Sequence, residues 1–181
     1  MIGDRWGVTP AETGRRYPCD DIVASPALAA WRGVTVHAAT GAVWPWVAQI
    51  RLAPYAYGWI DNRGRRSPSE LIALPEPTAG EPFTTVGTRR VGRILSVSSG
   101  EQLTGRISGV VMSYLLVPDG GDTRLLLKIV TSRARRVAPL LSIGDLIMAR
   151  RQLLNLKQLA EHSSPTTPAG SGDQGLPGPG I

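Results

Sequence analysis

Residues 142–162 read SIGDLIMARRQLLNLKQLAEH, and this stretch decides the fold. Its apolar residues recur at spacings of three and four, which places them on one face of an α-helix. Ser142 is placed to cap that helix, and Asp145 to meet the positive end of its dipole. The polar residues Gln152 and Asn155 are expected on the opposite side. The apolar face consists of Leu146, Ala149, Leu153, Leu156 and Ala160.

Such a helix needs an apolar surface to cover it, and residues 83–133 supply one. There the spacing of apolar residues changes to two, which is typical of β-strands. Short turns at 98–100 and 118–121 predict hairpins and therefore an antiparallel sheet. In the last strand Leu125 alternates with Arg124 and Lys128, which predicts a sheet with one face in water. The expected strands are 83–86, 88–97, 102–107, 110–117 (apolar on both sides, hence central) and 124–133.

The chain before residue 83 is less regular. Residues 1–30 predict an arm packed on the domain, with Trp6 and Tyr17 as its anchors because large aromatic side chains are seldom fully exposed. Residues 32–37 alternate as a first strand. A helix is expected to follow up to about residue 49, with Thr40 as its cap.

Proline marks further boundaries. Pro45 lies inside the expected helix, where it removes a backbone hydrogen bond. Ser67 and Pro68 predict the start of another short helix. Residues 163–181 are mostly Pro, Gly, Ser and Thr, so they predict a disordered tail.

The order of these elements predicts an α+β, helix-grip fold, in which a curved antiparallel sheet wraps around a long C-terminal helix. A bent sheet and a straight helix cannot touch everywhere, so a ligand cavity is expected between them. The ligand-binding domain is predicted to span residues 31–162.

Composition narrows the class of protein. The chain has 181 residues, of which 42% are hydrophobic, as in an ordinary globular domain. It shows no signal-peptide pattern and no apolar run long enough to cross a membrane. Its single cysteine, Cys19, excludes an internal disulfide and favours the cytoplasm. The net charge of +6 comes from 20 basic residues, nearly all arginine, against 14 acidic ones. Because the arginines are scattered and not interleaved with aromatics, nucleic acid is not expected as a partner.

Several segments resemble one known family. They are VWPW at 43–46, QIRLAPYAYGWIDN at 49–62, GRRSP at 64–68, VPDG at 117–120 with TRL at 123–125, and the helix from GDLIM at 144–148 to LAE at 159–161. Together they resemble the SRPBCC superfamily, the START-like group that contains polyketide cyclases/dehydrases and lipid-transfer proteins. The resemblance covers roughly residues 20–162 and implies a deep hydrophobic cavity, but no particular reaction. Ala56 and Gly58 stand where this group has polar residues, which puts any role of those positions in doubt.

An aromatic cluster is the main candidate site. Its side chains either wall one end of the cavity, where they would stack on a flat ligand, or belong to the packed core. Residues of the central strand and of the long helix would complete the lining. The candidate ligand-binding residues are Trp46, Tyr55, Tyr57, Trp59, Met112, Tyr114, Leu146 and Leu153.

Catalytic chemistry has few candidates. A Cys19–His37 pair is conceivable, but there is no metal-ligand spacing and no phosphate-binding loop. We therefore expect no cofactor and no metal. The first hypothesis is a monomer or homodimer that binds a small apolar ligand, for example an aromatic or polyketide-like one. The alternatives are a cyclase or dehydratase in which Tyr114 or Tyr57 supplies a proton, and a basic module for nucleic acid or anionic membranes.

Overall fold

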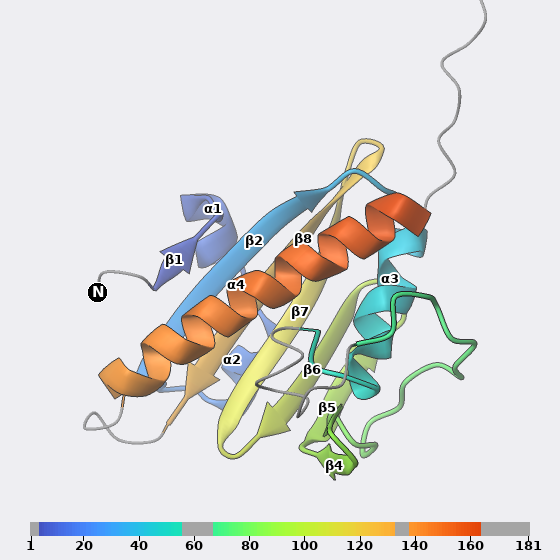
Figure 1. Ribbon diagram of the computed structural model, residues 1–181. Coiled ribbons are helices and arrows are strands. Elements are labelled where there is room, and N and C mark those ends of the chain that lie inside the picture. Colours follow the sequence, from blue (N-terminus) through green and yellow to red (C-terminus); the bar gives the residue numbers. More distant parts are fainter. Residues whose placement is uncertain (1–3, 56–66, 133–137, 164–181) are drawn as a thin grey trace, which may run out of the picture.

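The computed structural model describes residues 4–55, 67–132 and 138–163, with side chains in the last range from Met148 onward. The chain forms one sheet of six strands, a separate two-stranded hairpin, short helices and one long C-terminal helix (Figure 1). The elements are β1 (Arg5–Trp6), α1 (Pro10–Gly14), α2 (Pro18–Ile22), β2 (Leu28–Val36), α3 (Thr40–Ala48), the 3₁₀ turn η1 (Gln49–Arg51), β3 (Thr84–Val86), β4 (Arg89–Val91), β5 (Arg93–Ser98), β6 (Gln102–Ile107), β7 (Val110–Asp119), β8 (Asp122–Thr131) and α4 (Ala138–Ser163).

The six-stranded sheet has the order β1-β2-β8-β7-β6-β5. Only β1 and β2 are parallel, and the other pairs are antiparallel, as predicted from the hairpin turns. β7 lies between β8 and β6, which confirms its central place. The strand expected at 88–97 is instead divided at Gly92, whose φ of 71° is left-handed. A Cβ at this position would collide with the carbonyl oxygen of Arg106, so glycine permits the break.

α4 lies across one face of this sheet, which we call the inner face (Figure 1). The helix begins at Ala138, before the predicted Ser142, and ends at Ser163. Leu153 and Leu156 are fully buried and share one hydrophobic cluster with Leu125 and Leu127 of β8. The α+β class and the long C-terminal helix are therefore confirmed.

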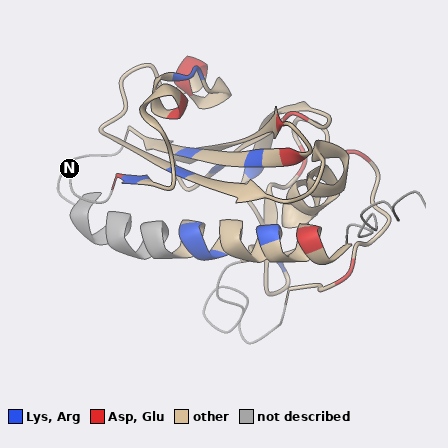
Figure 2. Ribbon diagram, turned by 90° about the horizontal axis from the view of Figure 1, so that it is seen from above, with Lys and Arg blue, Asp and Glu red and all other residues tan. Residues whose placement is uncertain are grey.

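The N-terminal segment covers the opposite, outer face of the sheet along β7 and β8. Figure 2 shows α1 and α2 on this side and α4 on the other. Tyr17 and Cys19 are fully buried against Leu126 and Val130. The prediction of a water-exposed face is therefore wrong along β8, whereas Arg93 and Arg106 on the same face of β5 and β6 are exposed. Alternation of basic and apolar residues indicates which side chains share a face, but not that another segment covers them and pairs Glu12 and Asp20 with Arg124 and Lys128.

Two shorter predictions also differ from the structure. The helix expected from Ser67 is absent, since the described residues 67–82 contain neither helix nor strand. α3 begins at Thr40 as expected, but its N-cap is Ala39, which offers no side-chain acceptor. Residues 1–3 and 164–181 lie outside the described part, so the disordered tail stays a prediction. Among the described residues, no helix is both long and apolar enough to cross a membrane.

Candidate functional site

The predicted ligand-binding residues gather at the inner face where they are described. Trp46, Tyr55, Tyr114 and Leu153 are buried in one cluster, and Met112 is half-buried against it. Tyr57 and Trp59 lie outside the described residues, as does the side chain of Leu146. The fold thus brings together α3, β7 and α4, which are distant in sequence, around one set of aromatic rings.

Trp46 has an unusual environment. α3 directs its indole ring into the core, where the side chain is fully buried. Its ring meets that of Tyr55 edge to face, with the centroids 6.4 Å apart. Among the described residues, the buried Trp46 Nε1 has no hydrogen-bond partner. A buried N–H without an acceptor carries a desolvation penalty of about 1–3 kcal/mol, so this donor calls for an explanation.

The indole of Trp31 is the other described side chain with an unpaired buried N–H. Trp31 belongs to the outer face, where Lys128 Nζ lies 5.0 Å from its ring centroid and Arg5 lies 5.9 Å from it. Cation–π contacts therefore hold the Trp31 ring on the outer face of the sheet. Trp46 is the indole that faces the inner core.

A chain of neutral hydrogen bonds crosses from the sheet to α4. The Tyr114 hydroxyl donates to Gln152 Oε1 over 2.6 Å, and Gln152 Nε2 donates to the carbonyl oxygen of Pro54 over 2.5 Å. Gln152 is buried, so its expected place on the exposed side of the helix is wrong. The reason is that a buried amide satisfies both of its ends here.

A second set of bonds fixes the segment after α3. Gln49 Nε2 donates to the Tyr55 hydroxyl over 2.6 Å and to the carbonyl oxygen of Glu70 over 2.9 Å. Gln49 Oε1 accepts from the backbone N–H of Ile72. Asn155 Nδ2 donates to the carbonyl oxygen of Tyr55, whose φ of 54° is left-handed. These contacts hold a strained tyrosine in place beneath the helix.

The ionisable groups among these aromatics stay neutral. Burial raises the pKa of Tyr114 far above its ordinary value, against the opposing effect of its bond to Gln152. Burial likewise raises the pKa of Tyr55. Neither phenol is therefore suited to give up a proton near neutral pH.

One charged side chain of the inner face escaped the sequence analysis. Arg32 pairs in register with Leu127 and is almost fully buried. Its Nη1 donates to the backbone carbonyls of Asp4 and Trp31, and burial lowers its pKa. The sequence predicts that Arg32 begins the first strand, but the alternation of residues does not predict that a basic side chain there is buried.

The conceivable nucleophile pair is not formed. Cys19 is buried in the outer cluster, and burial raises the pKa of its thiol, which makes it unreactive. His37 is exposed beyond the end of β2, with Nδ1 2.9 Å from an Asp122 carboxylate oxygen. Within the described residues, no group of three or more His, Cys, Asp and Glu side chains is arranged to hold a metal ion.

Comparisons with known proteins leave the site without an assigned role. No protein-family model matches the sequence, and no curated protein matches it. Several solved structures are similar at low identity. Protein MLL2253 from Mesorhizobium loti is 14% identical with a TM-score of 0.49, over 75% of this chain and 98% of that one. KanY is 17% identical with a TM-score of 0.48, over 74% and 97%. The AHSA1-like protein from Aeromonas hydrophila is 15% identical with a TM-score of 0.42, over 74% and 93%. Similarities this low carry no argument about a ligand or an activity.

Proposed function

We propose that this protein binds a small, largely apolar ligand between the inner face of its sheet and α4, in a helix-grip fold of the SRPBCC type. The observation that carries the proposal is the buried N–H of Trp46, which has no acceptor among the described residues. A carbonyl or ether oxygen on the ligand would accept this hydrogen bond. Tyr57, Trp59 and Leu146 are proposed to complete the lining.

The surroundings of Trp46 suit such a ligand. Tyr55 supplies an aromatic edge, and Leu153 of α4 supplies an apolar wall. Ligand sites of this kind combine apolar walls with a few polar groups that fix orientation. The ligand is therefore proposed to be flat or aromatic and to carry one acceptor.

The chemistry of the described residues favours binding over catalysis. The Tyr114 hydroxyl already donates to Gln152, and burial holds the pKa of Tyr114 above its ordinary value. A general acid needs a pKa close to the working pH. A cyclase or dehydratase using Tyr114 would thus have to break a buried hydrogen bond and overcome a mismatched pKa.

Two probes of similar size test the proposal. Acetophenone carries a carbonyl acceptor, and ethylbenzene lacks one. We expect Trp46→Phe to weaken acetophenone binding by about tenfold, the loss of one buried hydrogen bond, while ethylbenzene affinity changes much less. Affinities are measured by methyl NMR titration of the full chain, with the shifts followed at Leu153 and Met112.

Trp44→Phe is the matched control. Trp44 lies on the same helix, but its Nε1 already donates to Glu76 over 3.1 Å. This variant should bind both probes with the affinities of the parent protein. An equal loss for both probes in Trp46→Phe would show a packing effect and overturn the proposed hydrogen bond. No saturable shift for either probe in the parent would overturn the ligand site itself.

A further inference from the structure

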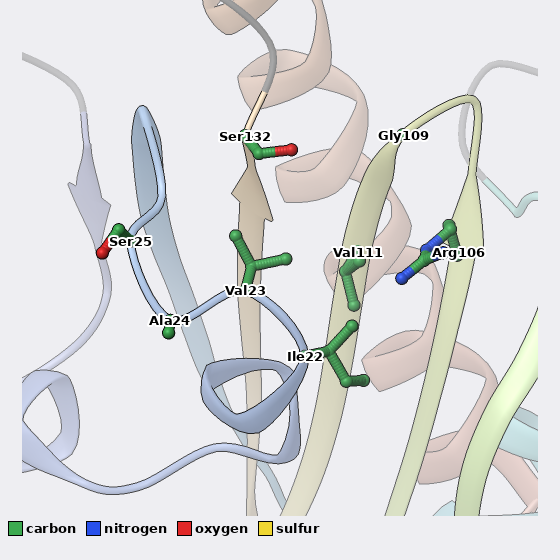
Figure 3. A pocket seen from close by; sticks show the side chains of 8 residues that line it. All are labelled: Ile22, Val23, Ala24, Ser25, Arg106, Gly109, Val111 and Ser132. Carbon is green, nitrogen blue, oxygen red and sulfur yellow. The ribbon is translucent and has the colours of Figure 1, made fainter.

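A pocket of about 360 Å³ opens on the outer face of the sheet (Figure 3). Trp46 belongs to the cluster on the other face. It lies where the end of α2 meets the β6–β7 turn and the end of β8. Ile22, Val23 and Val111 form its apolar wall. Its volume is within the range of small-molecule sites.

The polar side of this pocket is basic. Figure 3 shows the Arg106 guanidinium extending from β6 toward Val111, and the Ser132 hydroxyl just past the end of β8, on the other side of β7. None of the described residues that line the pocket is acidic. The two acidic residues of α2 already form ion pairs, Asp20 with Lys128 and Asp21 with Arg16.

Arg106 also stands opposite another arginine. Arg93 of β5 is its direct partner in the register of β5 and β6, so the two side chains share the outer face. Both are exposed, and neither forms an ion pair with any described residue. Like charges directly opposite each other destabilise a sheet. A bound anion would relieve that repulsion.

We propose that this pocket binds a small amphipathic carboxylate, with its carboxylate on Arg106 and its apolar body against Ile22, Val23 and Val111. A guanidinium donates two parallel N–H bonds to a carboxylate, a geometry that a lysine does not offer. Arg93 adds positive charge, and the Ser132 hydroxyl adds a donor. The proposal does not rest on the inner site, because the two sites lie on opposite faces of the sheet.

Sodium octanoate is the probe, with acetate and octan-1-ol as its two halves. Each is titrated into the full-length protein and followed by the methyl NMR shifts of Ile22, Val23 and Val111. Octanoate should bind saturably at these methyls and more tightly than either half, because the two parts of the pocket act together. Shifts at Leu153 in place of Ile22 would report the inner site and overturn the assignment.

Variants then separate charge from shape. Arg106→Gln should weaken octanoate binding about tenfold or more, and Arg106→Lys should recover only part of the loss. Ala24→Trp, at an exposed position that lines the pocket, should block it. Arg151→Gln, an exposed arginine on α4, is the control and should bind as the parent does. Equal affinity in Arg106→Gln and Arg151→Gln would overturn the proposal.

Discussion

Tyr114 and Gln152 join the central strand to α4 through a buried hydrogen bond of 2.6 Å. Tyr114→Phe removes the donor and leaves Gln152 Oε1 unpaired, so we expect the free energy of unfolding to fall by about 1–2 kcal/mol. Gln152→Leu should lower it further, because it leaves both the Tyr114 hydroxyl and the Pro54 carbonyl without a partner. Urea denaturation followed by circular dichroism measures both.

The double variant checks that the two residues act as a pair. If the hydrogen bond is the source of the effect, the combined loss in Tyr114→Phe/Gln152→Leu will be smaller than the sum of the single losses. Strict additivity would mean that each side chain contributes through its own packing.

At this scale the sequence predicts which aromatic residues lie inside more readily than it predicts their polar partners. The aromatic cluster identifies Trp46 and Tyr55 as candidates for a lining or a core, and the period of two in the central strand adds Tyr114. Gln49 and Gln152 are also buried, although glutamine is typical of exposed helix positions. Only the three-dimensional structure shows that each amide has a donor and an acceptor within reach. The isolated N–H of Trp46 is invisible to the sequence for the same reason.

Among the elements, α1 is joined to the sheet by an ion pair between Glu12 and Arg124 of β8. Arg124 donates from Nε and Nη2 to the two carboxylate oxygens of Glu12, over 2.8 and 3.0 Å. Thr9 caps the same helix in a capping box with Glu12. Burial raises the pKa of Glu12, but these contacts outweigh it and leave that pKa below its ordinary value of 4.5.

The docking of α1 should therefore depend on pH. A carboxylate with a lowered pKa stabilises the fold above its unfolded-state pKa, and this contribution is lost as the pH falls through the folded-state value. Glu12→Gln should be less stable than the parent at neutral pH, by on the order of 1 kcal/mol. The gap should close below about pH 4. Thermal unfolding between pH 7 and pH 3 measures it, with the exposed Asp119→Asn as a control whose gap should not follow this course. A gap that stays constant with pH would contradict the assigned role of Glu12.

The elements themselves follow from the sequence where one physical signal dominates. α4 has a strong apolar periodicity and forms as predicted, except that it begins at Ala138 and not at Ser142, and β6 forms at its predicted bounds. β1, α1 and α2 are too short to show a period, so the sequence predicts only an arm over residues 1–30, within which they lie. Ser67 and Pro68 carry a helix-start pattern, but the segment after them is bonded to Gln49 in place of forming a helix. A local signal yields there to a tertiary contact.

In the whole molecule, α4 covers the inner face of the sheet, and the N-terminal segment covers the outer face along β7 and β8 (Figure 2). The second cover has its own electrostatics. Lys128 is 8% exposed, pairs with Asp20 at 2.5 Å and lies 5.3 Å from the ring centroid of Tyr17. A buried charge is tolerated only when it is paired, so the sheet and the arm depend on each other.

Removal of residues 1–26 tests this dependence at the scale of the chain. The deletion exposes Leu126 and Val130 and leaves Lys128 without Asp20. We expect the free energy of unfolding to fall by roughly 3–6 kcal/mol, the burial of two or three large apolar side chains. Binding of a fluorescent hydrophobic dye should rise, because an apolar sheet face becomes accessible. Addition of the 1–26 peptide should reverse both effects, because the arm is held against the sheet by apolar packing and an ion pair. A shortened chain as stable as the parent, with no added dye binding, would mean that α4 alone sustains the sheet and that the arm only rests on it.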